Sequence, residues 1–278
     1  MVSGLLRKVR NYWMGRAAKF ICQRPIQVRS DPPLISFTFD DFPRSALSVG
    51  GEILNRHGLA GTYYAAFGLA GRQTRSGQIF EMSDLLQLVR QGHELGCHTY
   101  GHCHSWDTDA EAYEKSVIEN RIALKEVFPD AEFKSFSYPY CAPRPVLKRR
   151  VARHFLSCRG GAQGINAGDT DLNQLDAFFL EKTRGDIQLV REIIDRNCVQ
   201  HGWLIFATHD ISDSPTPFGC TPRFFENVVQ YAANSGARIL PVTQAMQVLR
   251  ANCNRDFRHE ILIQGRGTKP PVLSDHLQ

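Results

Sequence analysis

The sequence predicts an α/β fold, in the form of a barrel rather than a short open sheet. From about residue 34 onward, apolar strand-like segments alternate with amphipathic helix-like segments. This alternation is typical of parallel strands joined by helical crossovers. About seven such units follow one another, and 278 residues with 42% hydrophobic content are enough for one large core.

The first half of the chain contains five predicted strands. "LISFTF" is a continuous apolar run, as expected for a buried strand, and "GTYYAAF" is rich in β-branched and aromatic residues. The helical periodicity is clearest in the segment 109–128, which ends before Pro129. We expect strands at 34–39, 61–67, 93–99, 133–139 and 153–159, and helices at 45–57, 83–91 and 109–128.

The second half continues the alternation with its strongest signals. "GWLIFATHD" (202–210) is the clearest buried strand of the chain, and a strong amphipathic helix (186–200) precedes it. A helix at 222–235, a strand at 237–242 and a helix at 243–250 follow. We therefore divide the chain into an N-terminal extension (1–30), a barrel (31–252) and an irregular C-terminal tail (253–278) without periodicity.

The positive charge is concentrated in the N-terminal extension. Residues 1–30 carry seven basic residues and no acidic one, so the remaining chain has a net charge of −2 out of the total +5. Leu5, Leu6, Val9, Trp13 and Phe20 alternate with the basic residues at roughly helical spacing. One interpretation is an amphipathic helix on an anionic membrane surface; the other is a docking helix or frayed extension with solvated charges. Nucleic-acid binding is disfavoured, because the charge lies outside the barrel.

The cysteines and the N-terminus favour a cytoplasmic location, and the basic extension is compatible with a peripheral position at the inner membrane surface. The eight cysteines include no CxxC pair and mostly lie in apolar stretches, which is typical of free thiols in a reducing compartment. The N-terminus lacks the continuous apolar stretch of a secretory signal.

Polar residues follow several predicted strands at the point where each strand ends. Because the carboxyl ends of parallel barrel strands meet at one rim, these side chains are expected to converge there. They are Asp40 and Asp41, His98 and His102, Tyr140, and His209 with Asp210.

The segment "HTYGH" places His98 and His102 four residues apart, which on a helical turn brings both imidazoles to one side. The alternative is a polar loop with incidental histidines, since His104 lies close by. With an aspartate pair at a neighbouring rim position, a site with two histidines and one carboxylate is favoured. Such a site leaves positions open for water and substrate.

His209 follows an apolar strand with no cysteine or histidine near it in sequence. A histidine at a strand end is often structural. In a metal-dependent hydrolase, it would serve as the general acid that protonates the leaving group.

Together the motifs "TFDD" (38–41), "HTYGH" (98–102), "YPY" (138–140) and "FATHD" (206–210) resemble those of the polysaccharide deacetylase family, the NodB-homology domain of carbohydrate esterase family 4. The resemblance covers roughly residues 34–250. It implies a distorted (β/α)7 barrel and metal-dependent removal of N-acetyl groups, and occasionally O-acetyl groups, from sugars.

The resemblance also implies a role for each motif residue. Asp40 matches the general base, and Asp41, His98 and His102 match the ligands of one divalent metal ion, for which zinc is our first expectation. His209 matches the general acid, and Tyr140 the residue whose backbone N–H helps to hold the oxyanion. The expected substrate is an N-acetylated sugar in a polysaccharide, an oligosaccharide or a glycolipid intermediate.

The chain departs from the family pattern at three places. Ser137 stands where the family often has an arginine that pairs with the base, so Arg159 becomes a candidate partner for Asp40, with a surface arginine as the alternative. Phe42 replaces a common glycine, which would narrow the cleft or contact substrate. The fourth motif, an acidic residue that tunes the acid histidine, is not identified; the candidates are Asp169, Asp171 and Asp176.

The missing arginine supports an alternative function, a catalytically weak sugar-binding relative that keeps the metal site. Retention of Asp40 and His209 argues against it, because binding alone needs neither a base nor an acid.

Overall fold

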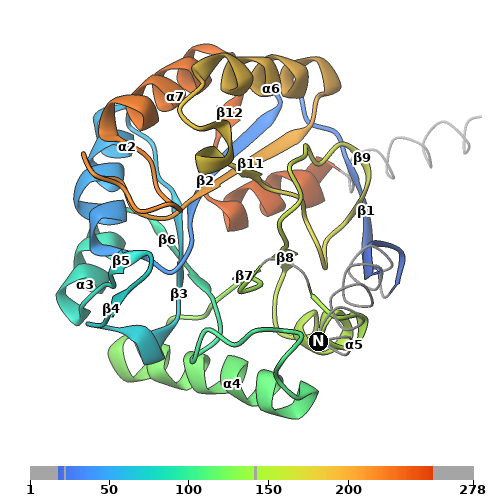
Figure 1. Cartoon of the computed structure of the whole chain (residues 1–278). Coiled ribbons are helices and arrows are strands. Elements are labelled where there is room, and N and C mark those ends of the chain that lie inside the picture. The colour runs from blue at the N-terminus through green and yellow to red at the C-terminus, as the bar shows by residue number, and fades with distance from the viewer. Residues whose placement is uncertain (1–17, 22, 141–142, 253–278) are drawn as a thin grey trace, which may run out of the picture.

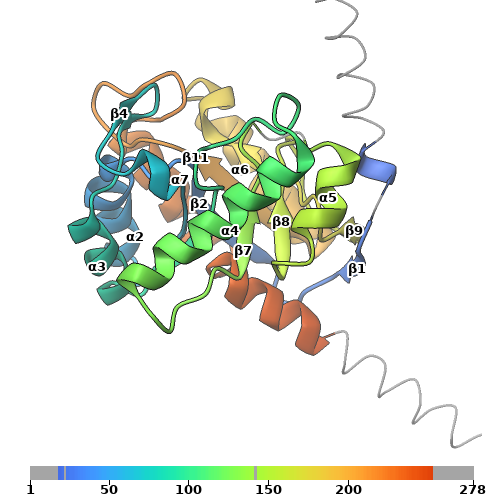
Figure 2. The ribbon, with the colours of Figure 1, turned by 90° about the horizontal axis from the view of Figure 1, so that it is seen from below.

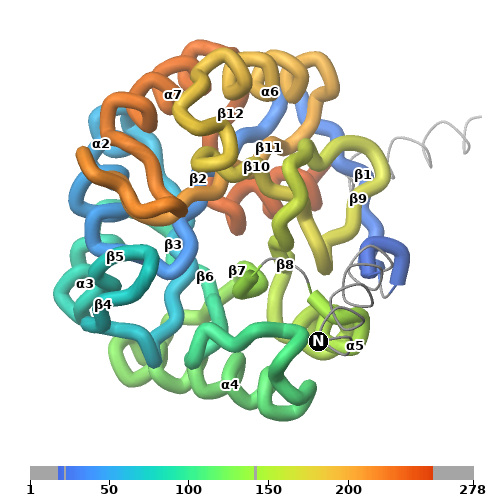
Figure 3. The backbone as a smooth tube through the Cα atoms, in the orientation of Figure 1, coloured from blue at the N-terminus to red at the C-terminus, as the bar shows by residue number. Residues whose placement is uncertain are grey.

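The computed structural model describes residues 18–252 except 22 and 141–142. A curled parallel sheet lies at the centre and helices surround it (Figure 1). The predicted α/β barrel class is therefore confirmed. The backbone tube shows the strands arranged around a common interior, with α2, α3, α4, α6 and α7 outside them (Figure 3).

The elements have the following bounds. The strands are β1 (Pro25–Val28), β2 (Leu34–Phe39), β3 (Thr62–Ala65), β4 (Gln73–Thr74), β5 (Gly77–Gln78), β6 (Glu94–Cys97), β7 (Ser135–Ser137), β8 (Ser157–Arg159), β9 (Gly168–Asp171), β10 (Phe178–Phe179), β11 (Trp203–Thr208) and β12 (Arg238–Ile239). The helices are α2 (Glu52–Arg56), α3 (Met82–Arg90), α4 (Ala110–Val127), α5 (Pro145–Val151), α6 (Ile187–Gln200), α7 (Pro222–Asn234) and a last one at 242–252. The short turns are η1 (Ala18–Phe20), η2 (Ala46–Gly51), η3 (Phe67–Leu69) and η4 (Leu180–Thr183).

The main sheet runs in the order β10-β11-β2-β3-β6-β7-β8, with every neighbouring pair parallel. β2 and β11 are buried along their whole length, as their apolar sequences predict for strands covered on both faces. Phe39 pairs with Thr208, so the residues that follow these two strands begin side by side at the same end of the sheet. The parallel topology thus brings the carboxyl ends of the strands to one rim.

Residues 172–177 link the two ends of the curled sheet. The Cys158 N–H donates to the Leu172 carbonyl and the Gly160 N–H to the Leu175 carbonyl, both at 2.8 Å, while the Leu175 N–H donates back to Cys158 at 2.9 Å. This segment leads directly into β10. β8, at one edge of the sheet, is therefore hydrogen-bonded to the segment just before β10, the strand at the other edge.

The structure also differs from the sequence predictions. Residues 25–28, placed within the N-terminal extension, form β1, which pairs with β9 in an antiparallel ribbon on the barrel. The predicted helix at 45–57 is divided into a π-helical turn, η2, and the short helix α2. Helix α5 was not anticipated. The amphipathic helix expected in the extension runs to Phe20: its residues 1–17 lie outside the described residues, and Ala18–Phe20 form the 3-10 turn η1. The tail from residue 253 also lies outside the described residues.

Within residues 18–252, no helix combines the length and the apolar character needed to cross a bilayer. Five cysteines of the described part, Cys97, Cys103, Cys158, Cys198 and Cys220, are free thiols. Burial raises the pKa of Cys97, Cys158 and Cys220 to about 12, so these three thiols stay protonated and act as small apolar core residues.

Candidate active site

The polar residues singled out in the sequence come together at the carboxyl-terminal rim. Asp40 and Asp41 follow β2, His98 follows β6 and His209 follows β11. Ser137 and Arg159 are the last residues of β7 and β8. Five strands therefore contribute to one site.

Asp41, His98 and His102 form a group whose ligand atoms all lie within 4.8 Å of one another. The Asp41 Oδ1 atom is 2.9 Å from His102 Nε2 and 3.5 Å from His98 Nε2, and it is buried without a hydrogen-bond partner among the described residues. His98 Nδ1 lies 2.8 Å from the Ser137 carbonyl, which requires Nδ1 to carry the proton and directs the Nε2 lone pair toward Asp41. This donor set fits a divalent metal ion.

Burial alone would raise the pKa of Asp41, but the imidazoles of His102 and His98 beside its carboxylate hold that pKa well below its ordinary value. The second oxygen, Oδ2, accepts a hydrogen bond from the hydroxyl of Ser76. Ser76 is buried at the tip of the β4–β5 hairpin, and its own N–H is held by Thr74 Oγ1 at 3.1 Å. The hairpin therefore fixes the orientation of the Asp41 carboxylate from outside the donor set.

The HTYGH segment is not helical, as its histidine spacing suggested, but a tight connection after β6. Thr99 and His102 adopt left-handed backbone conformations with φ of 58° and 52°. Of the seven non-glycine residues with positive φ in the described part, five belong to this rim: Asp41, Phe42, Thr99, His102 and Tyr140. Such conformations are costly for L-residues and cluster at functional sites. Backbone turns, rather than one face of a helix, therefore bring the His98 and His102 side chains together.

Asp40 is buried and paired with a cation. Its Oδ1 atom accepts hydrogen bonds from Arg159 Nη2 and, at 3.2 Å, from the Ser137 hydroxyl, while Arg159 Nη2 also donates to Ser137 Oγ at 2.8 Å. Burial would raise the pKa of Asp40, but the Arg159 guanidinium and the nearby His98 and His209 lower it. Asp40 is therefore ionised. Ser137, at the position where the family often has an arginine, is hydrogen-bonded to both Asp40 and Arg159.

His209 lies at the open end of β11, half-buried beside the loop 211–220. Its Nδ1 atom is 3.2 Å from the Phe218 carbonyl and its ring centroid is 5.4 Å from the Phe218 ring. The loop is fastened to buried Asp210, whose carboxylate accepts hydrogen bonds from the Thr216 N–H at 2.8 Å and the Thr216 hydroxyl at 2.5 Å. With Nδ1 bound to a carbonyl, Nε2 is left for proton exchange.

Glu181 is a carboxyl group near this site that was not predicted from the sequence. It belongs to η4, and its Oε2 atom is buried with no hydrogen-bond partner in the described chain. Burial raises its pKa to about 7, although the charge of His209 opposes that shift. No local motif marks Glu181; only its position directly after the edge strand β10 could have suggested it. Ser76 was also missed, because no local motif marks it and it reaches Asp41 only through a tertiary contact.

The three aspartates considered for the fourth motif are engaged elsewhere. Asp171 pairs with buried Lys148 at 2.6 Å, Asp169 accepts from Gln27 at 2.5 Å, and Asp176 pairs with Lys19 at 3.4 Å. All three contacts lie around the β1–β9 ribbon.

Phe42 neither narrows a cleft nor faces substrate, contrary to one sequence expectation. It is fully buried and stacks on Phe80, with ring centroids 4.9 Å apart. Tyr140, by contrast, is 59% exposed, and its ring lies 4.8 Å from His102 and 4.6 Å from His104. Tyr140 therefore stands at the open edge of the metal-binding group.

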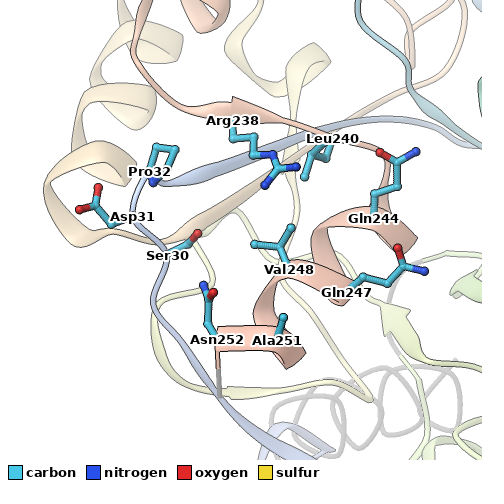
Figure 4. Close-up of a pocket in the computed structure, with 10 residues that line it drawn as sticks. All are labelled: Ser30, Asp31, Pro32, Arg238, Leu240, Gln244, Gln247, Val248, Ala251 and Asn252. Atoms are coloured by element: carbon cyan, nitrogen blue, oxygen red, sulfur yellow. The ribbon is translucent and has the colours of Figure 1, made fainter. Parts of the chain in front are cut away.

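A cavity of about 560 Å³ lies away from this rim. Figure 4 shows its lining, which comes from the loop before β2, from β12 and its continuation, and from the helix at 242–252. None of the residues of the site described above contributes to it. This cavity is therefore separate from the group of polar residues at the rim.

The fold is an α/β barrel, and its rim carries a group of residues that could hold a metal ion. Residues 27–155 match the model of the family described as polysaccharide deacetylase, the family that the motifs of the chain resemble. The matched region includes Asp40, Asp41, His98, His102 and Tyr140. No match is found among curated proteins.

Several solved structures share the fold. A Mycobacterium smegmatis protein is 14% identical with a TM-score of 0.61, covering 92% of this chain and 100% of that one. A family 4 acetyl xylan esterase from Clostridium thermocellum, in complex with a cobalt ion, is 18% identical with a TM-score of 0.55, covering 77% and 91%. Peptidoglycan deacetylase PdaC from Bacillus subtilis is 14% identical with a TM-score of 0.55, covering 83% and 98%.

Proposed function

We propose that the protein is a metal-dependent hydrolase that removes N-acetyl groups from a sugar in a glycan or glycolipid. The match of residues 27–155 to the polysaccharide deacetylase family model supports deacetylation. The observation that carries the proposal is the position of ionised Asp40 beside the Asp41–His98–His102 group. A general base next to a metal site is one arrangement that can hydrolyse an amide, because the metal activates this poor electrophile and the base activates water.

Asp41, His98 and His102 would hold the metal ion, zinc or another divalent cation. Asp41 Oδ1 is buried and has no hydrogen-bond partner among the described residues, and it faces His102 Nε2, so this set of donor atoms fits such an ion. When bound, the ion would polarise the acetyl carbonyl and lower the pKa of water. The cobalt ion in the Clostridium thermocellum esterase is consistent with this assignment.

The chain's own residues would perform the proton transfers. Asp40, kept ionised by Arg159, would accept the proton of the attacking water. The backbone N–H of Tyr140 would donate to the negative charge that develops on the acetyl oxygen. His209, oriented by the Phe218 carbonyl, would donate a proton from Nε2 to the departing amine. Acetate and a free amino sugar would result.

The test is acetate release by the wild type and by Asp40→Asn from a panel of N-acetylated glycans, with metal content measured in parallel. The variant should keep its metal and lose about 10²–10⁴-fold in turnover. A chelator should abolish wild-type release. Full activity of Asp40→Asn would overturn the assignment of the base.

The second candidate is a sugar-binding relative with little catalysis. Its main support was the missing arginine of the third motif. The contact between Arg159 and Asp40 weakens that support, because a guanidinium does reach the base. Wild-type binding of N-acetylated glycans without acetate release would favour this candidate.

A further inference from the structure

The end of the short turn η1 and the residue after it carry two adjacent large apolar side chains that face solvent. Phe20 is 80% exposed and Ile21 is 44% exposed. Val146, on the neighbouring helix α5, is 48% exposed. Grouped apolar side chains of this size on a surface mark a contact region more often than isolated ones do.

The turn is held against α5 by a buried cation. Lys148 has no exposed surface, and its Nζ atom donates to the Ala18 carbonyl at 2.5 Å and to Asp171 Oδ2 at 2.6 Å. Arg24 Nη1 donates to the Phe155 carbonyl at 3.0 Å, next to the end of the same helix. Since a buried ammonium is stable only when it is paired, these contacts fix the turn in one place. Phe20 and Ile21 are therefore presented in a defined direction.

The surroundings of these apolar residues are basic. Arg149 is exposed and follows Val146 by three residues on α5, so the two lie on the same side of that helix, and Arg153 is exposed in the turn that follows α5. Lys19 is exposed and contacts Asp176 at 3.4 Å, while Glu111 at the edge pairs weakly with Arg150 at 4.0 Å. The first turn of α5 contains no acidic residue.

The chain just before η1 adds to this charge. Residues 1–17 contain four basic residues and no acidic one: Arg7, Lys8, Arg10 and Arg16. Exposed apolar side chains among basic ones are complementary to an anionic bilayer, whose headgroups attract lysine and arginine while its interface accepts apolar groups.

This surface lies on the same side of the barrel as the active site. α5 begins at Pro145, five residues after Tyr140. In Figure 2, η1, α5 and the β4–β5 hairpin all lie in the upper half of the molecule, and the helix at 242–252 lies at the bottom. A bilayer that contacted η1 and α5 would therefore lie close to the rim that carries Asp40.

We propose that the η1–α5 surface, formed by Lys19, Phe20, Ile21, Val146, Arg149 and Arg153, docks the protein on an anionic lipid bilayer. We further infer that the N-acetylated sugar is attached to a lipid; this second part rests on the proposed deacetylase function.

The test of docking is sedimentation of the full chain with vesicles of phosphatidylcholine, with and without phosphatidylglycerol. The wild type should bind the anionic vesicles, and salt should weaken the binding. The double variant Phe20→Ser, Ile21→Ser should bind about tenfold less or weaker still. Arg149→Gln and Arg153→Gln should each lower binding about fivefold.

Val199→Ser is the matched control, because Val199 is 81% exposed but lies on α6. It should bind like the wild type. Equal binding to neutral and anionic vesicles would overturn the docking proposal. So would wild-type binding by the Phe20–Ile21 variant, or an equal loss in Val199→Ser, with thermal unfolding confirming that each variant is folded.

Acetate release separates docking from function. The Phe20–Ile21 variant should release acetate from short N-acetylated oligosaccharides at the wild-type rate, but about tenfold more slowly from an N-acetylated glycolipid in anionic vesicles. Equal rates on the glycolipid would overturn the lipid-linked substrate. Vesicle binding without acetate release from any substrate would overturn the proposed function and leave docking intact.

Discussion

Arg159 donates a hydrogen bond from Nη2 to Oδ1 of Asp40 across the interior of the barrel. The two residues lie at the ends of β8 and β2, which are separated by β3, β6 and β7 in the sheet. The guanidinium is nearly fully buried and lies over the ring of Tyr64, 5.1 Å from its centroid. In the family that the motifs resemble, an arginine at the position of Ser137 often pairs with the base. Here the guanidinium comes from Arg159 on the next strand, β8, and the small side chain of Ser137 leaves room for it.

Replacing Arg159 by methionine should shift the acidic limb of the pH–rate profile to higher pH. The guanidinium lowers the pKa of Asp40, so its loss raises that pKa, and the base becomes protonated at a higher pH. We expect a shift of about 1–3 pH units.

The measurement is kcat/KM for acetate release between pH 4 and 9. Arg159→Lys, which keeps the charge, should show a smaller shift, and exposed Arg149→Met should show none. Because removing one partner of a buried pair costs about 3–5 kcal/mol, the folded fraction must be checked by unfolding. An unchanged acidic limb in Arg159→Met would show that Arg159 does not tune the base.

Ser76→Ala should weaken metal binding without removing a ligand. The Ser76 hydroxyl donates to Asp41 Oδ2 and so fixes the carboxylate plane. Loss of such an outer contact typically costs 10–100-fold in metal affinity. Titration of the metal-free protein with Zn²⁺ measures this directly. Gln78→Ala, in the same hairpin but exposed, serves as the control and should bind metal normally.

Glu181→Gln should flatten the pH dependence of stability near neutrality. The folded-state pKa of Glu181 is raised to about 7 from an ordinary 4.5, so the folded state favours the protonated form. Its stabilising contribution is therefore complete below about pH 4.5 and is lost as the pH rises through about 7.

Thermal unfolding from pH 5 to 8 measures this effect. The wild type should lose more stability over that range than Glu181→Gln does, and Glu192→Gln, on the surface of α6, should follow the wild type. Parallel curves for the wild type and Glu181→Gln would contradict the raised pKa.

Gly219→Ala should reduce turnover by displacing the loop beside His209. A Cβ atom at this position would lie 2.2 Å from both the carbonyl oxygen and Oδ1 of Asp210, so the loop must shift. The Phe218 carbonyl that orients His209 would move with it, and a displacement of about 1 Å can cost up to about 100-fold in rate.

The readout for Gly219→Ala is kcat for acetate release, compared with Ser214→Ala at an exposed position of the same loop. Ser214→Ala should be neutral. Normal turnover in Gly219→Ala would mean that the loop does not position the acid.

The predictable part of the fold was the part with continuous apolar sequence. β2 and β11 are long, apolar and buried on both faces, so their segments stood out. α4 was located because eighteen residues give a clear helical period. β1 and β9 were missed because four-residue strands such as "GDTD" are polar and gain their pairing from a partner about 140 residues away.

The site was predictable where chemistry lies in local motifs. Asp41, His98 and His102 converge as the motifs indicated, although left-handed turns rather than a helix achieve it. Ser76 and Glu181 could not be found this way, because each meets the site through tertiary contacts and has no motif of its own.

Arg159 is also the residue of β8 that pairs with Leu175, in the segment that links the two ends of the sheet. The partner of the base is thus carried by the strand that closes the barrel. If that closure opened locally, Asp40 would lose its cation while every motif residue stayed in place. We therefore expect inactivation to precede global unfolding. The contacts between β8 and residues 172–177 would set the range of conditions over which the Asp40 carboxylate keeps its charge.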